Sequence, residues 1–362
     1  MYISLQGISK QYANVWAIDR VNMAIEKQEF VSLLGPSGSG KTTLLRVIAG
    51  LEKPTEGRVL IDGEDVTELP PHKRGVAMVF QEFLLFPHRT VRENLAFPLR
   101  MMKMPKAEMN ERIDWALGIL SLQGLDGRYP NQLSGGQQQR VALGRGLVGR
   151  PKVLLLDEPL ANLDRELRQE MEVEIRRYQM KLGIPFIYVT HNQEEALSMS
   201  DRIAVVNKGH VEDFAERTTL YDRPKTAFIA QFVGRSNKFE GKVAAVDGGR
   251  YTVEAGGFTL TASGGGPLKP GDAALAFVKN EKIALAPEGF AGEDNSLPCV
   301  VRDVILRGAY AEYLLETGDG LGLVASRPRS GEGPSIGHAV VAHWAAGDID
   351  LYPVKPDLGL RR

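Results

Sequence analysis

The stretch with the clearest chemical potential runs from Gly35 to Thr42 and reads Gly-Pro-Ser-Gly-Ser-Gly-Lys-Thr. It follows the apolar run 30–34 and precedes a helix-like stretch. Glycines at this spacing let backbone N–H groups face phosphates, while a lysine reaches the β- and γ-phosphates and a hydroxyl binds Mg²⁺. The helix N-terminus adds positive charge. The stretch therefore predicts a P-loop for a nucleoside triphosphate. Its predicted ligands are Gly35, Pro36, Ser37, Gly38, Ser39, Gly40, Lys41, Thr42 and Thr43.

Polar residues follow three further apolar runs, at the points where strands would end. The runs are 76–80, 153–156 and 186–190, and the residues after them are Gln81, Asp157, Glu158 and His191. A nucleotide on an open α/β sheet lies beyond the carboxyl ends of its strands. If these strands are neighbours, the polar side chains converge on one triphosphate.

The residue types suggest separate roles in phosphoryl transfer. We expect Asp157 to hold Mg²⁺ through water and Glu158 to polarise a water for attack on the γ-phosphate. An Asp-Glu pair after a strand is ordinarily a solvated turn or a helix cap, but the phosphate loop and Pro159 favour the functional interpretation here. Taken singly, Gln81 is equally well a surface amide and His191 a core or capping histidine.

A second distinctive string, Leu133-Ser-Gly-Gly-Gln137, precedes a helical stretch. Its serine hydroxyl, open glycine amides and helix N-terminus form another potential anion site. Alone, it is equally well a glycine turn capped by a serine. One triphosphate rarely needs two such anion sites from one subunit. The string therefore suggests a dimer in which the second anion site of each subunit closes over the ATP bound to its partner.

Composition describes a globular chain of 362 residues with a net charge of −1, long enough for two or three domains. No basic excess points to nucleic acid. The single cysteine, Cys299, cannot form an internal disulfide, which suits a reducing cytoplasm, and it is more readily a core residue than a reactive thiol. No apolar run approaches about 20 residues, so we expect membrane contact only through a partner.

The pattern of apolar residues along the chain changes at about Gly234. Before it, β-branched runs alternate with amphipathic helical stretches, which predicts an α/β domain with a largely parallel sheet. We expect one helix over 165–182 and a helical insertion over about 99–149. After Gly234, short alternating runs predict an all-β region, with 263–267 as a loop.

These strings together resemble the nucleotide-binding subunit of an ATP-binding cassette (ABC) transporter, over essentially the whole chain. The corresponding motifs are Gly35 to Thr42 for Walker A, Gln81 for the Q-loop, Leu133 to Gln137 for the signature, Val153 to Asp157 for Walker B with Glu158 as catalytic glutamate, Ala161 to Asp164 for the D-loop and His191 as the switch histidine. Six motifs in this order are specific.

The resemblance implies an α/β P-loop NTPase fold with a helical subdomain over residues 1–235, followed by an all-β, OB-like TOBE domain over 236–362. It also implies that two cassettes sandwich two ATP molecules and that Tyr12 stacks on adenine. The facing cassette would add Ser134, Gly135, Gly136, Gln137 and Asp164. The implied catalytic residues are Glu158, His191 and Gln81, and the implied Mg²⁺ site contains Thr42, Gln81 and Asp157.

The tail resembles importers of the polyamine, ferric-iron, sulfate and aminophosphonate group, through the string 228–237 and the β-rich segment after it. This implies a peripheral protein at the cytoplasmic face of the inner membrane. Its partners would be permease subunits, an external solute-binding protein indirectly, and a second copy of itself, but no nucleic acid. Residues 81–99, with the apolar string 83–88, resemble the groove for a permease helix, although ordinary packing explains that string equally well.

Two departures from the family pattern stand out. Gly144 and Gly146 replace alanines that are usual there, and each weakens helix propensity by about 1 kcal/mol. The string 277–281 differs from the usual Val-Arg-Pro-Glu, which weakens the transfer of any ligand function to the tail. A rival function is a soluble ABC protein that regulates or remodels nucleic acid or ribosomes. Such proteins generally carry two cassettes, and this chain has no strongly basic arm.

Overall fold

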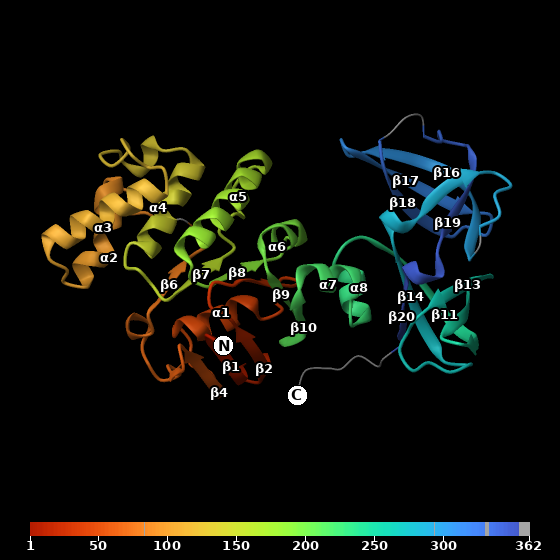
Figure 1. Cartoon of the computed structure of the whole chain (residues 1–362), viewed down its shortest axis with the longest axis horizontal. Helices are drawn as coiled ribbons and strands as arrows, with labels where there is room; N and C mark the ends of the chain where they lie inside the picture. The colour runs from red at the N-terminus through yellow and green to blue at the C-terminus, as the bar shows by residue number, and fades with distance from the viewer. Residues whose placement is uncertain (83, 293, 330–332, 355–362) are drawn as a thin grey trace. The chain divides into compact units, whose positions relative to one another are not determined.

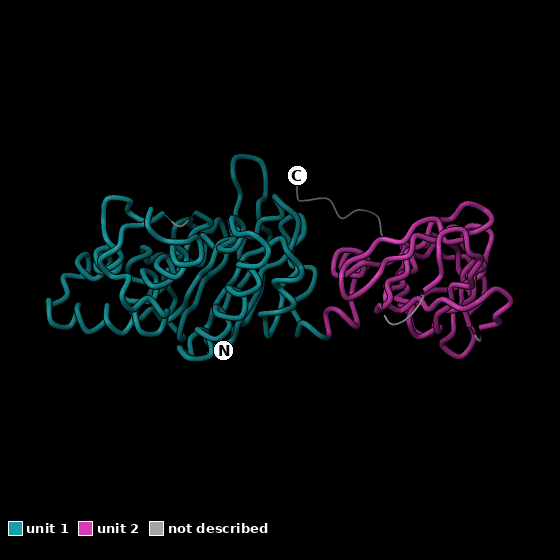
Figure 2. Tube along the Cα trace, turned by 90° about the horizontal axis from the view of Figure 1, so that it is seen from above, with its two compact units in different colours: residues 1–218, 359–362 teal, residues 219–358 magenta. Residues whose placement is uncertain are grey.

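The computed structural model describes residues 1–82, 84–292, 294–329 and 333–354. The chain divides into two compact units, and Figure 2 colours them separately. Unit 1 begins at Met1 and ends at Thr218, and unit 2 follows from Thr219. The sequence places a domain boundary at 235–236 instead. Helix α8 (Ala227–Phe232) lies between the two positions and packs on strands β11 and β14 of unit 2.

Unit 1 is built on a central sheet that, among the described residues, has six strands in the order β10-β9-β3-β8-β7-β6 (Figure 1). All neighbours pair in parallel except β10, which joins the edge antiparallel to β9. The strands are β3 (Phe30–Leu34), β6 (Val76–Val79), β7 (Val153–Asp157), β8 (Phe186–Thr190), β9 (Arg202–Asn207) and β10 (His210–Glu216). The largely parallel sheet predicted from the sequence is confirmed.

Both faces of this sheet are covered, which explains why its central strands are apolar without interruption. On β7, Leu154 and Leu156 pack in one core with the helices of the 91–182 region, whereas Leu155 faces a second core with α1 (Lys41–Ala49). An antiparallel sheet completes that second core. Its strands are β1 (Ile3–Tyr12), β2 (Val15–Ile25), β4 (Glu56–Ile61) and β5 (Glu64–Asp65).

The helices of unit 1 lie between its strands in chain order. They are α1 (Lys41–Ala49), α2 (Val91–Met101), α3 (Lys106–Ile119), α4 (Gly135–Leu147), α5 (Arg165–Leu182) and α6 (Gln193–Met199). Helix α5 has the predicted bounds and ends at Leu182, followed by its C-cap Gly183 with a φ of 64°. Its apolar side chains Met171, Ile175 and Tyr178 are buried. No described helix is long and apolar enough to span a bilayer.

Helices α2, α3 and α4 form a group beside β6 (Figure 1). The insertion was expected from about Leu99, but α2 already begins at Val91. Thr90 starts it there through a capping box with Glu93. Gly144 has a packing reason, because a Cβ on it would lie 2.7 Å from Leu120 Cδ1 and 2.8 Å from Leu95 Cδ2. The glycine thus lets α4 approach its neighbours closely.

Unit 2 contains two antiparallel sheets after the short helices α7 (Arg217–Asp222) and α8. Among the described residues, each sheet has five strands. The first contains β11 (Ser236–Asp247), β12 (Arg250–Ala255), β13 (Phe258–Ser263), β14 (Ala273–Lys279) and β20 (Ile349–Pro353). The second contains β15 (Ala284–Pro287), β16 (Asn295–Leu306), β17 (Tyr310–Thr317), β18 (Gly322–Pro328) and β19 (Ala339–Trp344).

The two sheets of unit 2 share one apolar core. Cys299 on β16 belongs to it and is 4% exposed, and burial raises the pKa of its thiol to about 11. The thiol is therefore protonated at neutral pH, and the prediction of a core residue is confirmed. Residues 263–267 connect β13 to β14 as predicted, apart from Ser263, which still belongs to β13.

Candidate functional site

The P-loop connects β3 to α1, and close approaches require two of its glycines. Gly40 has a φ of 105°, and a Cβ there would lie 2.4 Å from the carbonyl oxygen of Ala17. A Cβ on Gly35 would lie 2.0 Å from the carbonyl oxygen of Val206. The turn between β9 and β10 supports the loop, since Gly209 N–H donates to the carbonyl of Ser39 at 2.9 Å. The loop is therefore held against β2 and β9 without side chains in between.

The Lys41 ammonium lies inside this loop. Its Nζ donates to the carbonyls of Gly35 at 2.9 Å and Pro36 at 2.8 Å, and the residue is only 5% exposed. Burial lowers the pKa of Lys41, while the charges of Glu158 and Asp157 act in the opposite direction. The Ser39 hydroxyl is also buried, and the described residues provide no hydrogen-bond partner for it. A buried cation beside an unsatisfied hydroxyl fits an anionic ligand such as a phosphate.

Thr42 and Asp157 are brought together by the helix start and the end of β7. The Thr42 hydroxyl donates to Asp157 Oδ1 at 3.1 Å. Burial raises the pKa of Asp157, and the hydrogen bond from Thr42 partly offsets this. A hydroxyl next to a carboxylate supplies the hard oxygen ligands that Mg²⁺ prefers. The chemistry of this pair fits the predicted metal.

Glu158 and His191 also meet. Their parent strands β7 and β8 are neighbours in the sheet, and His191 Nδ1 lies 3.0 Å from Glu158 Oε2. The Glu158 side chain is 20% exposed and that of His191 is 57% exposed, so water can reach both. Glu158 has a φ of 44°, in the left-handed region that glycine favours. Asp157 bonds with Thr42 and Glu158 with His191, so the two adjacent carboxylates have different partners.

Gln81 lies after β6 with an exposed side chain. Its carbonyl accepts a hydrogen bond from Asn162 Nδ2 at 3.4 Å, which joins the predicted Q-loop to the predicted D-loop. The segment after it is also tied to α4, because Arg145 Nη1 donates to the carbonyl of Leu84 at 2.7 Å. Gln81 thus takes its place near the D-loop through its backbone.

The apolar string 83–88, proposed as part of a docking groove, contains both exposed and packed side chains. Leu84 is 52% exposed, whereas Phe86 is partly buried and packs on Phe97 at a ring distance of 4.6 Å. Leu85 packs against the core of unit 1. Phe83 lies outside the described residues. Packing thus explains two members of the string, and Leu84 is available to a partner.

The signature string begins α4. Ser134 is its N-cap: its hydroxyl accepts from Gln137 N–H, and Gln137 Oε1 accepts from Ser134 N–H, at 3.3 and 3.1 Å. Gly136 packs on α5, where a Cβ would lie 2.7 Å from Leu167 Cδ1. Ser134 is exposed. Both interpretations of the string therefore hold locally: it is a capped turn, and it presents a helix N-terminus to solvent.

Two predicted nucleotide contacts lie at the surface. Asp164 caps α5 by accepting from Leu167 N–H at 3.0 Å. Tyr12, at the end of β1, is 42% exposed, and Lys10 Nζ lies 5.0 Å from its ring centre. An exposed aromatic ring can stack on a base.

The structure thus joins the sequence-predicted residues in three pairs. Thr42 bonds with Asp157 and Glu158 with His191, while Gln81 bonds with Asn162 of the D-loop. In the described part of the chain, the hydrogen bonds of Ser134 and Asp164 lie within their own helix caps.

Sequence reasoning missed Arg168 and Glu195, which lie behind this site. Glu195 is 4% exposed and accepts hydrogen bonds from Tyr188 and Thr190. Its position three residues after Asn192 resembles a capping box, which gives no hint of a buried carboxylate. Arg168 looks like any polar residue of an amphipathic helix.

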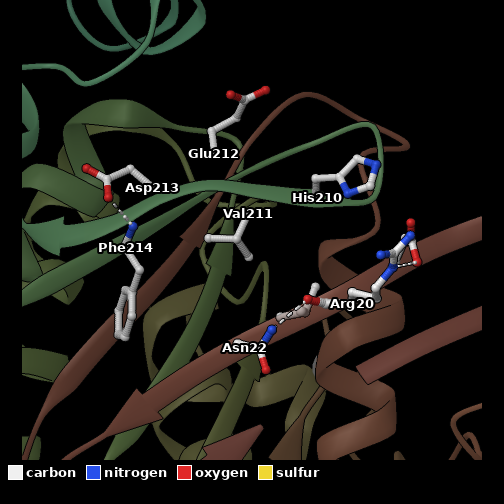
Figure 3. Close-up of a pocket in the computed structure, with 9 residues that line it drawn as sticks. Arg20, Asn22, His210, Val211, Glu212, Asp213 and Phe214 are labelled. Atoms are coloured by element: carbon white, nitrogen blue, oxygen red, sulfur yellow. Dashed lines mark hydrogen bonds and ion pairs between the residues drawn. The ribbon is translucent and has the colours of Figure 1, made fainter. Parts of the chain in front are cut away.

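A pocket of about 600 Å³ opens elsewhere in unit 1, between β2 and β10 (Figure 3). Its polar lining includes Asp19, Arg20, Asn22, His210 and Glu212. None of the predicted site residues lines it. It is therefore distinct from the predicted nucleotide site.

Comparison with known proteins agrees with this geometry. The ABC transporter family model matches residues 18–161, and the TOBE domain model matches residues 277–350. A spermidine/putrescine import ATP-binding protein of Rubrobacter xylanophilus is 46% identical over 349 residues, covering 95% of this chain and 92% of the relative. One of the same name from Pseudomonas aeruginosa is 40% identical, covering 94% and 96%.

Solved structures resemble unit 1. An ATP-binding cassette solved as a dimer in a post-hydrolysis state with ADP and Pi is 35% identical, with a TM-score of 0.53, and covers 59% of this chain and 98% of its own. The protein cbiO1 from Clostridium perfringens, part of an ABC transporter complex, is 30% identical with a TM-score of 0.58, covering 61% and 91%. With its P-loop ATPase fold followed by an all-β, OB-like TOBE domain, the chain belongs to the family of ABC transporter ATP-binding proteins.

Proposed function

We propose that this chain hydrolyses ATP with Mg²⁺ in order to energise import of a small solute through a separate membrane permease. The observation that carries the proposal is the Glu158–His191 pair, with 3.0 Å between His191 Nδ1 and Glu158 Oε2, beside the P-loop with its buried Lys41. A cassette that only bound ATP would need the P-loop but not this pair.

The hydrolytic step follows from the residues. Water attacks the γ-phosphorus, the bond to the β-phosphate oxygen breaks, and ADP and inorganic phosphate leave. Glu158 polarises the attacking water, and His191 orients Glu158 through Nδ1, which leaves its other ring nitrogen for the water or the phosphate. Lys41 exchanges its two carbonyl acceptors for phosphate oxygens, which are stronger acceptors. Positioning and charge neutralisation supply most of the catalysis.

Thr42 and Asp157 would hold Mg²⁺, with Gln81 as a further ligand. The ion supplies positive charge that neutralises the phosphates during transfer. Asp157 must be ionised for this role, and a nearby divalent cation offsets the burial that raises its pKa.

Two copies would complete the site. Ser134 lies at the exposed N-terminus of α4, where phosphates bind well, and the dimeric cassette solved with ADP and Pi supports this arrangement. In that dimer, Ser134, Gly135, Gly136, Gln137 and Asp164 of one copy would face the ATP on the P-loop of the other. Tyr12 would stack on the adenine.

The solute we propose is a polyamine, because relatives that match almost end to end are named spermidine/putrescine import proteins. The permease would dock near Leu84, and an external solute-binding protein would deliver the solute. The chain would then sit on the cytoplasmic face of the inner membrane. The rival function, a soluble regulator or remodeller, is not favoured by relatives that are named import proteins.

The experiment is to purify the tagged full chain from native membranes with ATP and to identify the proteins that accompany it by mass spectrometry. We expect a polytopic permease, and uptake of radiolabelled spermidine or putrescine that is lost on deletion of this chain. Recovery with soluble partners alone, such as ribosomes, would overturn the importer function. Normal polyamine uptake in the deletion strain would overturn the solute class alone.

A further inference from the structure

The residues on both sides of His191 bond to one carboxylate through their side chains. Thr190 Oγ1 donates to Glu195 Oε2 at 2.7 Å, and Asn192 Nδ2 donates to Glu195 Oε1 at 3.3 Å. The N–H of Asn192 also donates to Thr190 Oγ1 at 2.9 Å. His191 itself has an exposed side chain. Its position is therefore set by its two neighbours, and theirs by Glu195.

The Glu195 carboxylate is buried and accepts several hydrogen bonds from its surroundings. It lies in the first turn of α6 and is 4% exposed. The hydroxyl of Tyr188, a fully buried residue of β8, donates to Oε2 at 2.7 Å. Burial raises the pKa of Tyr188 well above its usual value, so the phenol keeps its proton and remains a donor. A buried carboxylate that accepts from several fixed donors is a rigid anchor.

Arg168 on α5 connects this anchor to the D-loop. Its Nε lies 3.8 Å from Glu195 Oε1, and its Nη2 donates to the carbonyl of Leu163 at 2.9 Å. Leu163 directly precedes Asp164, the N-cap of α5. One arginine thus contacts both the D-loop backbone and the carboxylate behind the switch histidine.

We infer that Glu195 is a positioning residue for ATP hydrolysis: it holds His191 against Glu158 through Thr190 and Asn192, and Arg168 links this arrangement to the D-loop. The inference rests on the proposed function, in which Glu158 and His191 act on water. Glu195 acts through its neighbours, because its carboxylate is buried behind the loop that bears His191. Since a misplacement of 1 Å can cost about 100-fold in rate, such an anchor affects turnover more than nucleotide binding.

The test uses Thr190→Val in the full chain, assayed for steady-state hydrolysis of Mg²⁺–ATP. Valine keeps the shape of threonine but removes the hydroxyl that joins Asn192 to Glu195. We expect kcat to fall about 10-fold with KM within about twofold, and Thr190→Ser to restore it. Tyr178→Phe is the matched control. It removes a similar hydroxyl–carboxylate bond, from buried Tyr178 to Glu174 on α5, which among the described residues has no link to Glu195 or the His191 loop, so its kcat stays within about twofold of wild type.

A double-mutant cycle separates this inference from the proposed function. If Thr190 acts through His191, Thr190→Val causes no further loss in a His191→Ala background. An unchanged kcat for Thr190→Val, or an equal loss in Tyr178→Phe, would overturn the inference while a defective His191→Ala still supports the proposed function. Full turnover in His191→Ala would overturn the role of His191 and the inference with it.

The link to the D-loop has its own cycle. Arg168→Met keeps most of the apolar stem but removes both contacts, and we expect its loss of kcat to be non-additive with that of Thr190→Val. Fully additive losses would remove Arg168 from the arrangement.

Discussion

His191 Nδ1 lies 3.0 Å from Glu158 Oε2, although 33 positions separate the two residues in the chain. Parallel pairing of β7 with β8 brings them together, because both residues follow the carboxyl ends of these strands. Glu158 makes this contact from a left-handed backbone conformation, with a φ of 44°. The pair is the structural basis for the first prediction.

Glu158→Gln should bind ATP and accumulate as a dimer but lose turnover by at least about 100-fold. The base for hydrolysis is lost, whereas the P-loop and the signature string that bind the phosphates remain. Size-exclusion chromatography with Mg²⁺–ATP and a phosphate-release assay measure the two effects. Glu170→Gln, on the exposed part of α5, is the control and should match wild type. Undiminished turnover in Glu158→Gln would remove Glu158 from its role.

Lys41→Ala should lose nucleotide affinity itself, because the variant lacks the buried cation that the phosphates would meet. We expect at least about a 10-fold rise in the Kd for ATP by isothermal titration calorimetry. Lys53→Ala is a suitable control, since Lys53 makes an exposed ion pair with Glu68. Normal ATP binding by Lys41→Ala would argue against the P-loop as the phosphate site.

Gly144→Ala should destabilise unit 1 by about 1–3 kcal/mol, even though alanine is the better helix former. The added Cβ would lie 2.7 Å from Leu120 Cδ1. Gly118→Ala in α3 is the matched control, because its nearest neighbour is a flexible amide at 3.8 Å, and it should be neutral or stabilising. Urea unfolding of both variants measures the difference. A stabilised Gly144→Ala would show that this helix contact is loose.

Asp350 on β20 should make the stability of unit 2 depend on pH. Burial raises its pKa to about 6, whereas an unfolded aspartate titrates near 3.9. The folded state therefore binds the proton more tightly, so this stabilisation is complete below pH of about 3.9 and is lost as the pH rises through 6. Relative to Asp350→Asn, wild type should lose about 1 kcal/mol between pH of about 5 and 7.5.

Hydrogen exchange in β14 and β20, corrected for intrinsic rates, measures this change, since these strands pair with each other. Asp247→Asn, at an exposed position on β11, is the control and should follow wild type at both pH values. Parallel pH curves for wild type and Asp350→Asn would contradict the prediction.

The pairing of strands explains how much of the site was predictable. Thr42, Asp157, Glu158 and His191 could be placed near one another because residues after parallel strands share one edge of a sheet. The helix start at Val91 was missed, since a capping box at Thr90 is only a local signal in a polar stretch. Gly144 was expected to weaken its helix, and its reason emerged only from Leu95 and Leu120, which lie far away in the chain.

By itself, the sequence determined the motifs, the alternation of strands and helices and the change to an all-β region, because local spacing and periodicity encode these features. Only the tertiary structure decided the partners of buried charges. Arg168 and Glu195 meet because α5 and α6 pack against each other, and a buried carboxylate is stable only where the fold surrounds it with donors. No local pattern contains that information, because the donors come from separate elements.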